Sequence, residues 1–110
     1  MEDRIRKIYC PMSETAFYIL LSLQQERHGY GIGQRIRELT GNHIIIGPGT
    51  MYGTLSKTEK DGLIEQTRVE NKRKYYRITG TGKEILHMEK DRIRHLYQIV
   101  EEDDRHEKNS

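Results

Sequence analysis

The chain has 110 residues, of which 34% are hydrophobic, and its mean hydropathy is −0.88, so we expect one domain with a thin core that gains stability by association. No apolar run reaches the ~18 residues of a membrane span, and the charged segment from Met1 to Lys7 is unlike a signal peptide. The net charge of +2 divides into −3 for the last ten residues and +5 for the first hundred, a balance that permits an anionic partner.

Apolar spacing predicts two early helices after a polar segment, residues 1–9, that forms a short helix at best and ends before Pro11. The first helix covers about residues 13–25, and one face of it is apolar: Ala16, Ile19, Leu20 and Leu23. A turn follows, and the second helix then runs to about Thr40, where Gly41 is a natural stop. Its apolar face consists of Ile32, Ile36 and Leu39.

A short β-branched run, residues 44–46, predicts a strand before the third helix, which begins at Pro48 and ends near Gly62. At 100° per residue this helix directs three side chains inward: Met51, Leu55 and Thr58. The opposite face is Gly53, Ser56, Lys57 and Lys60, flanked by Thr50 and Thr54 on one side and Tyr52 on the other. Small hydroxyl residues, glycine and lysine allow close approach to base edges and phosphates, although an ordinary solvated face has the same composition.

Two strands, 63–69 and 73–78, are predicted to form a hairpin around Asn71-Lys72, since asparagine tolerates the positive φ of a two-residue turn. The expected register pairs Val69 with Lys74, Thr67 with Tyr76 and Glu65 with Ile78. The segment from Arg68 to Arg77 holds five bases and one acid, so the hairpin carries a basic tip. Three helices followed by a β-hairpin are the winged helix-turn-helix arrangement, whose third helix usually enters the DNA major groove. Basic surfaces beside a helix-turn-helix are typical of DNA-binding proteins.

A last helix is predicted from a capping box at Thr81-x-x-Glu84 to about Glu102. Its apolar stripe includes Leu86, Ile93, Leu96 and Val100, and such a face on a helix that leaves its own domain usually packs on a partner. The expected domains are a DNA-binding domain with an N-terminal helical extension (1–80), a dimerisation helix (81–102) and a charged, disordered tail (103–110). The predicted fold is mainly α with a small β wing, a winged helix-turn-helix plus a C-terminal dimerisation helix.

Other sites have weak support in the sequence. The glycines of Gly29–Gly33 lack the GxGxxG spacing, and Glu84 replaces the Ser/Thr that a P-loop would place after Lys83. His87, Asp91 and His95 have metal-ligand spacing on one helical face, but exposed polar residues commonly share it, and we assign no metal, cofactor or catalytic residue. The sequence has one cysteine, Cys10, so no internal disulfide can form, which fits the cytoplasm. Cys10 would sense oxidants only if neighbouring bases lowered the pKa of its thiol.

Three segments carry a resemblance to a known family: HGYGIGQRIRELTG, GPGTMYGTLSKTEKDGLI and RKYYRITGTGKEIL. In this order and spacing, over roughly Met12 to Leu86, the chain resembles a PadR-type transcriptional regulator of the compact branch with a single C-terminal helix. The resemblance implies a homodimeric repressor that binds an operator and responds to a small molecule, with the final helix as the dimer contact. Thr58 stands where leucine is usual, which predicts looser packing of the third helix, and Gly53 replaces a common proline.

We therefore predict a dimeric, sequence-specific DNA-binding transcriptional regulator and not an enzyme, a repressor released by a small-molecule or stress signal. Its partners would be a palindromic double-stranded operator and a second copy of the chain, with no membrane. The alternative is a winged-helix interaction module whose basic wing binds an acidic protein. The expected DNA contacts are Tyr30, Thr50, Tyr52, Gly53, Thr54, Ser56, Lys57, Lys60, Lys72, Arg73 and Lys74. The expected dimer contacts are Ile5, Ile8, Leu86, Ile93, Leu96, Tyr97 and Val100, and Tyr97 or Phe17 could stack on an aromatic effector.

Overall fold

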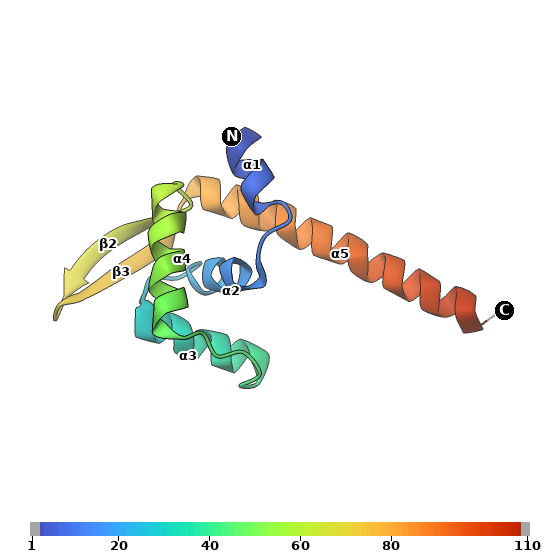
Figure 1. Ribbon diagram of the computed structural model, residues 1–110, viewed down its shortest axis with the longest axis horizontal. Helices are drawn as coiled ribbons and strands as arrows, with labels where there is room; N and C mark the ends of the chain where they lie inside the picture. The colour runs from blue at the N-terminus through green and yellow to red at the C-terminus, as the bar shows by residue number, and fades with distance from the viewer. Residues whose placement is uncertain (1–2, 109–110) are drawn as a thin grey trace.

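The computed structural model describes residues 3–108 and shows a helical body, a small sheet and one projecting helix (Figure 1). The elements in chain order are α1 (Asp3–Tyr9), α2 (Glu14–Ser22), β1 (Arg27–His28), α3 (Gly29–Thr40), α4 (Pro48–Lys60), β2 (Ile64–Glu70), β3 (Arg73–Ile78) and α5 (Gly80–Lys108). The strands form an antiparallel sheet in the order β1-β3-β2. The predicted winged helix-turn-helix with a long C-terminal helix is confirmed.

The molecule is elongated because α5 extends far beyond the body (Figure 1). Its radius of gyration is 16.1 Å, against about 13 Å for a compact domain of this size. Among the described residues, no helix combines the length with the apolar character that a membrane crossing requires. The 29 residues of α5 are rich in charge along their whole length.

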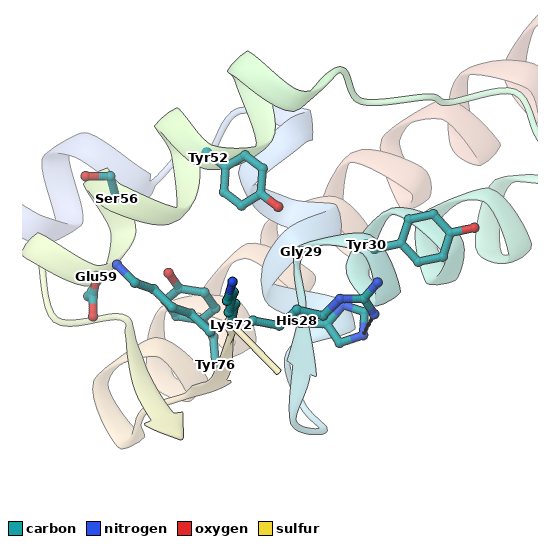
Figure 2. A pocket seen from close by; sticks show the side chains of 10 residues that line it. His28, Gly29, Tyr30, Tyr52, Ser56, Glu59, Lys72 and Tyr76 are labelled. Atoms are coloured by element: carbon teal, nitrogen blue, oxygen red, sulfur yellow. Dashed lines mark hydrogen bonds between the residues drawn. The ribbon is translucent and has the colours of Figure 1, made fainter. Parts of the chain in front are cut away.

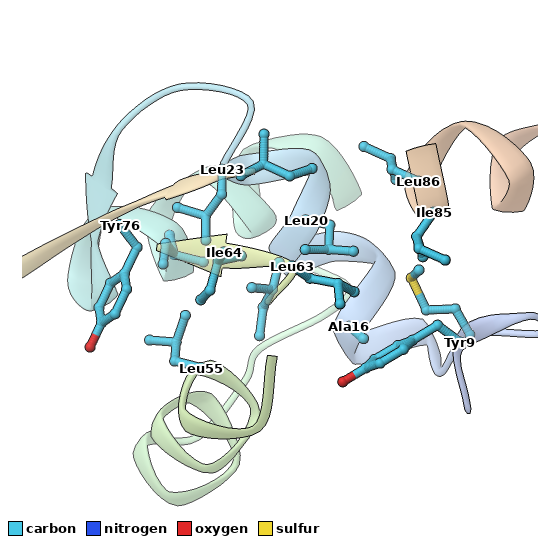
Figure 3. Packing of buried hydrophobic residues seen from close by; sticks show 14 of the residues in the cluster. Tyr9, Ala16, Leu20, Leu23, Leu55, Leu63, Ile64, Tyr76, Ile85 and Leu86 are labelled. Carbon is cyan, nitrogen blue, oxygen red and sulfur yellow. The ribbon is translucent and has the colours of Figure 1, made fainter. Parts of the chain in front are cut away.

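The core forms around α2, as its apolar face predicts (Figure 3). Ile19, Leu20 and Leu23 are fully buried, and the Ser13 hydroxyl caps the helix by accepting from the Ala16 N–H at 3.1 Å. The other helices and the wing, which is the hairpin of β2 and β3, each contribute residues to the same cluster: Tyr9, Ile32, Ile36, Leu55, Ile64, Tyr76, Ile85 and Leu86. This shared core fixes the position of α4 relative to the wing and to the start of α5.

The second helix is confirmed, but one of its apolar residues is not in the core. Gly41 ends α3 in the left-handed conformation with φ 59°, where a residue without Cβ is favoured. Leu39, predicted to face inward, lies one residue before the end of α3 and is 44% exposed.

The predicted strand at 44–46 is wrong, and a different segment takes the third place in the sheet. Ile44 and Ile46 pack against the core from a loop. Instead β1, predicted as a turn, pairs with β3 so that Arg27 lies opposite Tyr76 and His28 opposite Tyr75. A two-residue strand has no hydrophobic period, so its pairing is set by the neighbouring strand and leaves no sequence signal.

The hairpin turn is confirmed, and the register is correct only near the tip. Asn71 and Lys72 both have positive φ, and Val69 pairs with Lys74 as predicted. Beyond Arg68 the ladder shifts, so that Gln66 rather than Thr67 lies opposite Tyr76. Thr67 is the extra residue of a β-bulge, which a strict alternation from the turn cannot anticipate.

The last helix begins and ends differently from the prediction. Its cap is Thr79, whose Oγ1 accepts from the Gly82 N–H at 3.0 Å and donates to the Gly62 carbonyl at 2.6 Å, and not Thr81. The helix continues to Lys108, so the tail predicted from residue 103 is helical over 103–108, and residues 109–110 lie outside the described part. At this end Glu101 and Asp104 lie four residues before Arg105 and Lys108, a spacing that is compatible with a solvated helix.

Gly82, in the first turn of α5, is required by packing. A Cβ on this residue would overlap the Leu63 carbonyl oxygen and the Ile78 side chain. The first turn of α5 therefore packs directly against the backbone of Leu63, the residue before β2. This glycine allows the close packing of the helix on the wing.

Candidate nucleic-acid interface

The exposed face of α4 is the one predicted. Met51, Leu55 and Thr58 are buried, while Gly53, Ser56, Lys57 and Lys60 are exposed on the opposite side. Tyr52 and Thr50 are also exposed on the flanks, and Thr54 is half-buried. The helix begins after Gly47, which makes no side-chain cap, so no side chain of that residue covers the positive end of the helix dipole.

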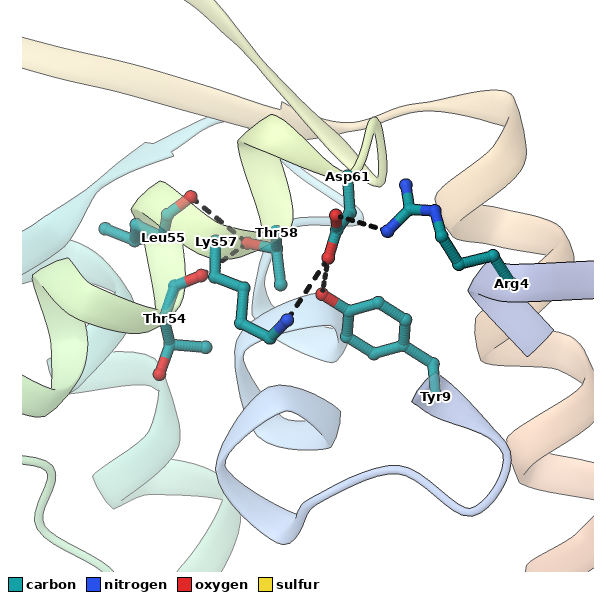
Figure 4. Close-up of polar contacts among 7 residues, drawn as sticks. All are labelled: Arg4, Tyr9, Thr54, Leu55, Lys57, Thr58 and Asp61. Atoms are coloured by element: carbon teal, nitrogen blue, oxygen red, sulfur yellow. Dashed lines mark hydrogen bonds and ion pairs between the residues drawn. The ribbon is translucent and has the colours of Figure 1, made fainter. Parts of the chain in front are cut away.

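Thr58, the departure from the usual leucine, is accommodated inside the helix. Its hydroxyl is 2.7 Å from the Thr54 carbonyl and 3.2 Å from the Leu55 carbonyl (Figure 4). A buried hydroxyl with these partners leaves no unpaired polar atom under the exposed face.

A groove of about 420 Å³ separates α4 from the wing (Figure 2). One wall is Tyr52, Ser56 and Glu59, three residues on one side of α4; the rest is His28, Gly29, Tyr30, Lys72, Arg73, Lys74 and Tyr76. Gly29 packs closely against Tyr52 of this wall, because a Cβ at Gly29 would lie 2.9 Å from the Tyr52 hydroxyl. The groove thus brings together predicted DNA contacts from α3, α4 and the wing.

The other edge of α4 is tied to α1 through Asp61 (Figure 4). The Tyr9 hydroxyl donates to Asp61 Oδ2 at 2.7 Å, and Lys57 Nζ lies 3.5 Å from the same oxygen and over the Tyr9 ring. Arg4 Nη1 lies 3.5 Å from Asp61 Oδ1. Lys57, predicted as a base contact, is therefore held at the α1 edge and not in the wing groove.

The wing tip presents its bases to solvent. Lys72, Arg73 and Lys74 are exposed at the turn. The two bases nearer the body are paired differently: Arg68 Nε lies 2.8 Å from Glu26 and its guanidinium covers the Tyr75 ring at 3.9 Å, and Arg77 lies 3.9 Å from Glu26. The five bases counted in the sequence thus divide into a tip that faces outward and a pair that stabilises the wing.

His28 lies at the corner of this groove and was missed as a candidate contact. Its Nδ1 accepts from the Gly31 N–H at 3.1 Å and caps α3, while Nε2 lies 3.2 Å from Arg73 Nη1. Burial, and next the charge of Arg73, lower the pKa of His28, which keeps the ring neutral near pH 7. The sequence places His28 two residues before Tyr30, the residue predicted to contact DNA, so the position of His28 in the motif was its only signal.

The predicted dimer contacts divide into buried and exposed residues. Ile5 and Leu86 are 4% and 2% exposed within this chain's own core, so they cannot reach a partner, and their assignment is corrected. Both predictions rest on helical spacing, which does not distinguish an internal from an external face. The remaining predicted residues are exposed: Ile8, Ile93, Leu96, Tyr97 and Val100. Ile99 extends the exposed apolar set on α5.

Cys10 is not activated by the bases near it. Burial and then the neighbouring Glu89 raise the pKa of its thiol, outweighing the opposite effect of Arg6 and Arg92. Glu89 itself is buried and bonded to Arg92 and to the Met12 N–H, the latter at 3.2 Å. A thiol with a raised pKa is a poor nucleophile toward oxidants.

His87 and Asp91, two of the three α5 residues with metal-ligand spacing, form an ordinary surface pair. His87 Nε2 lies 3.4 Å from Asp91, whose carboxylate also accepts from Arg94 at 2.8 Å. Within residues 3–108, the one group of three that brings ligand atoms together is Asp103, Asp104 and Glu107, all exposed. An exposed acidic group on a charged helix is no indication of a metal by itself, and none is assigned.

Comparisons with known proteins agree with this geometry. The family model described as the transcriptional regulator PadR-like family matches residues 19–88. A PadR family transcription regulator from Clostridium difficile R20291 is similar at TM-score 0.71 and 26% identity, covering 82% of this chain and 97% of that one. Bacillus subtilis PadR in complex with operator DNA is similar at TM-score 0.59 and 26% identity, over 68% of this chain and 45% of that one. An uncharacterized protein of Lysinibacillus sphaericus is 40% identical over 70 residues, 60% of this chain and 64% of that protein, so the chain spans less than two thirds of that relative.

Proposed function

The chain belongs to the PadR-like transcriptional regulator family, a family of non-enzymatic DNA-binding regulators, and from this premise we propose that it is a dimeric repressor of a palindromic operator. The observation that carries the proposal is the pairing of an exposed, small-residue face on α4 with a basic wing tip on the far side of one groove. A helix of this kind fits the major groove, where its side chains read base edges, while the wing contacts phosphates.

Several predicted residues support base readout from α4. Gly53 and Ser56 lie at the centre of the exposed face and allow the helix backbone to come close to the bases. Thr50 and Thr54 offer a methyl group and a hydroxyl, and Lys60 extends from the last turn. Tyr30 and Tyr52 flank the groove and suit sugar and phosphate contacts through their hydroxyl groups.

Dimerisation through α5 is proposed from its exposed apolar residues. Ile93, Leu96 and Val100 recur at helical spacing on a part of α5 that has left the body (Figure 1). A dimer would hold two copies of α4 at a fixed separation, as a two-fold operator requires. We further propose that a small-molecule or stress signal releases the repressor in the cytoplasm, and that an aromatic effector would stack on Tyr97 near the dimer contact.

The test is a mobility shift with duplexes from the promoter of the chain's own gene, beside a random duplex of equal length, over a range of salt concentrations. We expect tighter binding to the promoter fragment and a log-affinity that falls linearly with log-salt. Equal affinity for both duplexes would leave only non-specific binding. Failure to bind either duplex would favour an interaction module whose basic wing binds an acidic protein.

A further inference from the structure

The imidazole of His28 has a defined tautomer because of its place in the chain. It ends β1 and caps α3, and its Nδ1 accepts the hydrogen bond from the Gly31 N–H. A neutral imidazole has one acceptor nitrogen and one N–H donor. Since Nδ1 is the acceptor, Nε2 carries the proton.

That proton points at another donor. Nε2 of His28 lies 3.2 Å from Nη1 of Arg73, and a guanidinium has donors only. In the tautomer that caps α3, these two groups cannot bond to each other. In the opposite tautomer Nε2 would accept from Arg73, and the Gly31 N–H would lose its acceptor. The protein alone can satisfy one of the two contacts at a time.

The surroundings hold the ring where this conflict occurs. Tyr30 stacks on one side at a centroid distance of 6.4 Å, and Tyr75 meets the ring edge-on at 5.1 Å. His28 and Arg73 both line the wing groove together with Lys72 and Lys74 (Figure 2). An oxygen acceptor within hydrogen-bond distance of both nitrogens would remove the conflict. Three bases line the groove against one acid, Glu59, and this balance favours an anionic acceptor.

We propose that His28 Nε2–H and the Arg73 guanidinium donate together to one non-bridging phosphate oxygen of the DNA backbone that enters the wing groove. The inference rests on the proposed function and adds His28 to its contacts. A phosphate oxygen has lone pairs for both donors, so the α3 cap and both contacts are then satisfied at once. Because the ring is neutral, its share is a directional hydrogen bond without counterion release, whereas Arg73 contributes charge.

His28→Asn separates the two roles of the ring, because asparagine is a good N-cap whose short side chain cannot reach where Nε2 lies. We expect a melting temperature close to wild type and a loss of operator affinity of about tenfold or more, the size of one hydrogen bond to a charged acceptor. The slope of log-affinity against log-salt should stay unchanged, whereas Arg73→Ala should reduce it by about one. His87→Asn, on α5, is the matched control and should bind as wild type.

A double-mutant cycle tests whether one phosphate is shared. If His28 and Arg73 bond the same oxygen, His28→Asn should cost less in the Arg73→Ala background than in wild type. Nitrogen NMR of the wild-type protein gives a readout that does not depend on any variant folding. We expect Nε2 to carry the proton in the free protein, and its proton to exchange more slowly and shift in the DNA complex.

The outcomes distinguish this inference from the proposed function. A wild-type protein that binds no duplex would overturn the proposed function. A wild-type protein that binds its operator while His28→Asn binds equally well would overturn only the contact through His28. An Nε2 resonance that is unprotonated in the complex, or unaltered by DNA, would do the same, as would a fall in the His28→Asn melting temperature that accounts for its lost affinity.

Discussion

At the scale of single residues, Asp61 is an acid placed where a helix ordinarily favours a base. It forms the C-cap of α4, at the negative end of the helix dipole. The arrangement holds because Tyr9, Lys57 and Arg4 surround the carboxylate (Figure 4). Asp61 therefore joins α4 to α1, and the cost of its position is offset by contacts from another element.

This cluster predicts a defined dependence of stability on pH. Burial raises the pKa of Asp61, but the bond from Tyr9 and the charges of Lys57 and Arg4 outweigh it and lower the pKa overall. As pH falls, the unfolded chain takes up the proton first, so the stabilisation is complete above the unfolded pKa of ~3.9 and is lost as pH falls through the folded pKa. Urea unfolding at several pH values should show the difference between wild type and Asp61→Asn shrinking below about pH 4.

Tyr9→Phe tests the same contact from the other side, since it keeps the buried ring and removes only the hydroxyl that donates to Asp61. Its difference from wild type should shrink over the same pH range. If the difference between wild type and Asp61→Asn stays constant down to pH 3, the carboxylate gains nothing from these partners.

At the scale of elements, the sequence predicts features that follow from a hydrophobic period or from a local backbone preference. It misses features that result from pairing between distant segments. The inward line of α4, with Met51 and Leu55, follows from a period of 3.6, and the turn at Asn71-Lys72 follows from φ preferences. The bulge at Thr67 and the strand β1 have no period and result from tertiary pairing. In the interface, lysines on the face of α4 were predictable, but the bond from Tyr9 to Asp61 and the contact of Arg73 with His28 join elements distant in sequence.

The contact between α5 and β2 predicts a large effect of one methyl group. Gly82→Ala should destabilise the protein by about 2 kcal/mol or more, because the new Cβ meets the Leu63 backbone, and this exceeds the ~1 kcal/mol that alanine gains in a helix. Chemical denaturation measures the change. Gly80→Ala is the control, since nothing lies within 4 Å of its Cβ position. Equal stability of the two variants would show that α5 can shift away from β2.

The wing predicts an electrostatic effect without sequence preference. Lys72→Ala combined with Lys74→Ala should weaken binding to operator and random duplexes by similar factors and flatten the log-affinity against log-salt slope by about two. Fluorescence anisotropy at four or more salt concentrations measures both. Arg94→Ala with Lys108→Ala removes the same charge from α5 and should change the slope far less. A wing variant with the wild-type slope would show that the tip does not touch DNA.

At the scale of the whole molecule, the distal half of α5 lies away from the body with its apolar side chains uncovered. Leu96 and Val100 are about half exposed, on a helix that reaches well beyond its own core (Figure 1). A second copy packed on this face would set the distance between the two α4 helices. Half-sites would then be about 10 base pairs apart, centre to centre, or a multiple of that spacing.

Leu96→Asp tests this arrangement without changing any residue on the DNA face. An aspartate at the proposed contact would bury an unpaired carboxylate, so we expect sedimentation to show monomers and operator affinity to fall by at least tenfold. Gln98→Asp introduces the same charge on an exposed polar residue of α5 and should remain dimeric. Circular dichroism separates dissociation from unfolding.

Because Leu96 is 46% exposed in the single chain, aspartate there costs little without a partner. A Leu96→Asp protein that stays dimeric and binds normally would move the dimer contact elsewhere, and the exposed Ile8 of α1 would be the next surface to test.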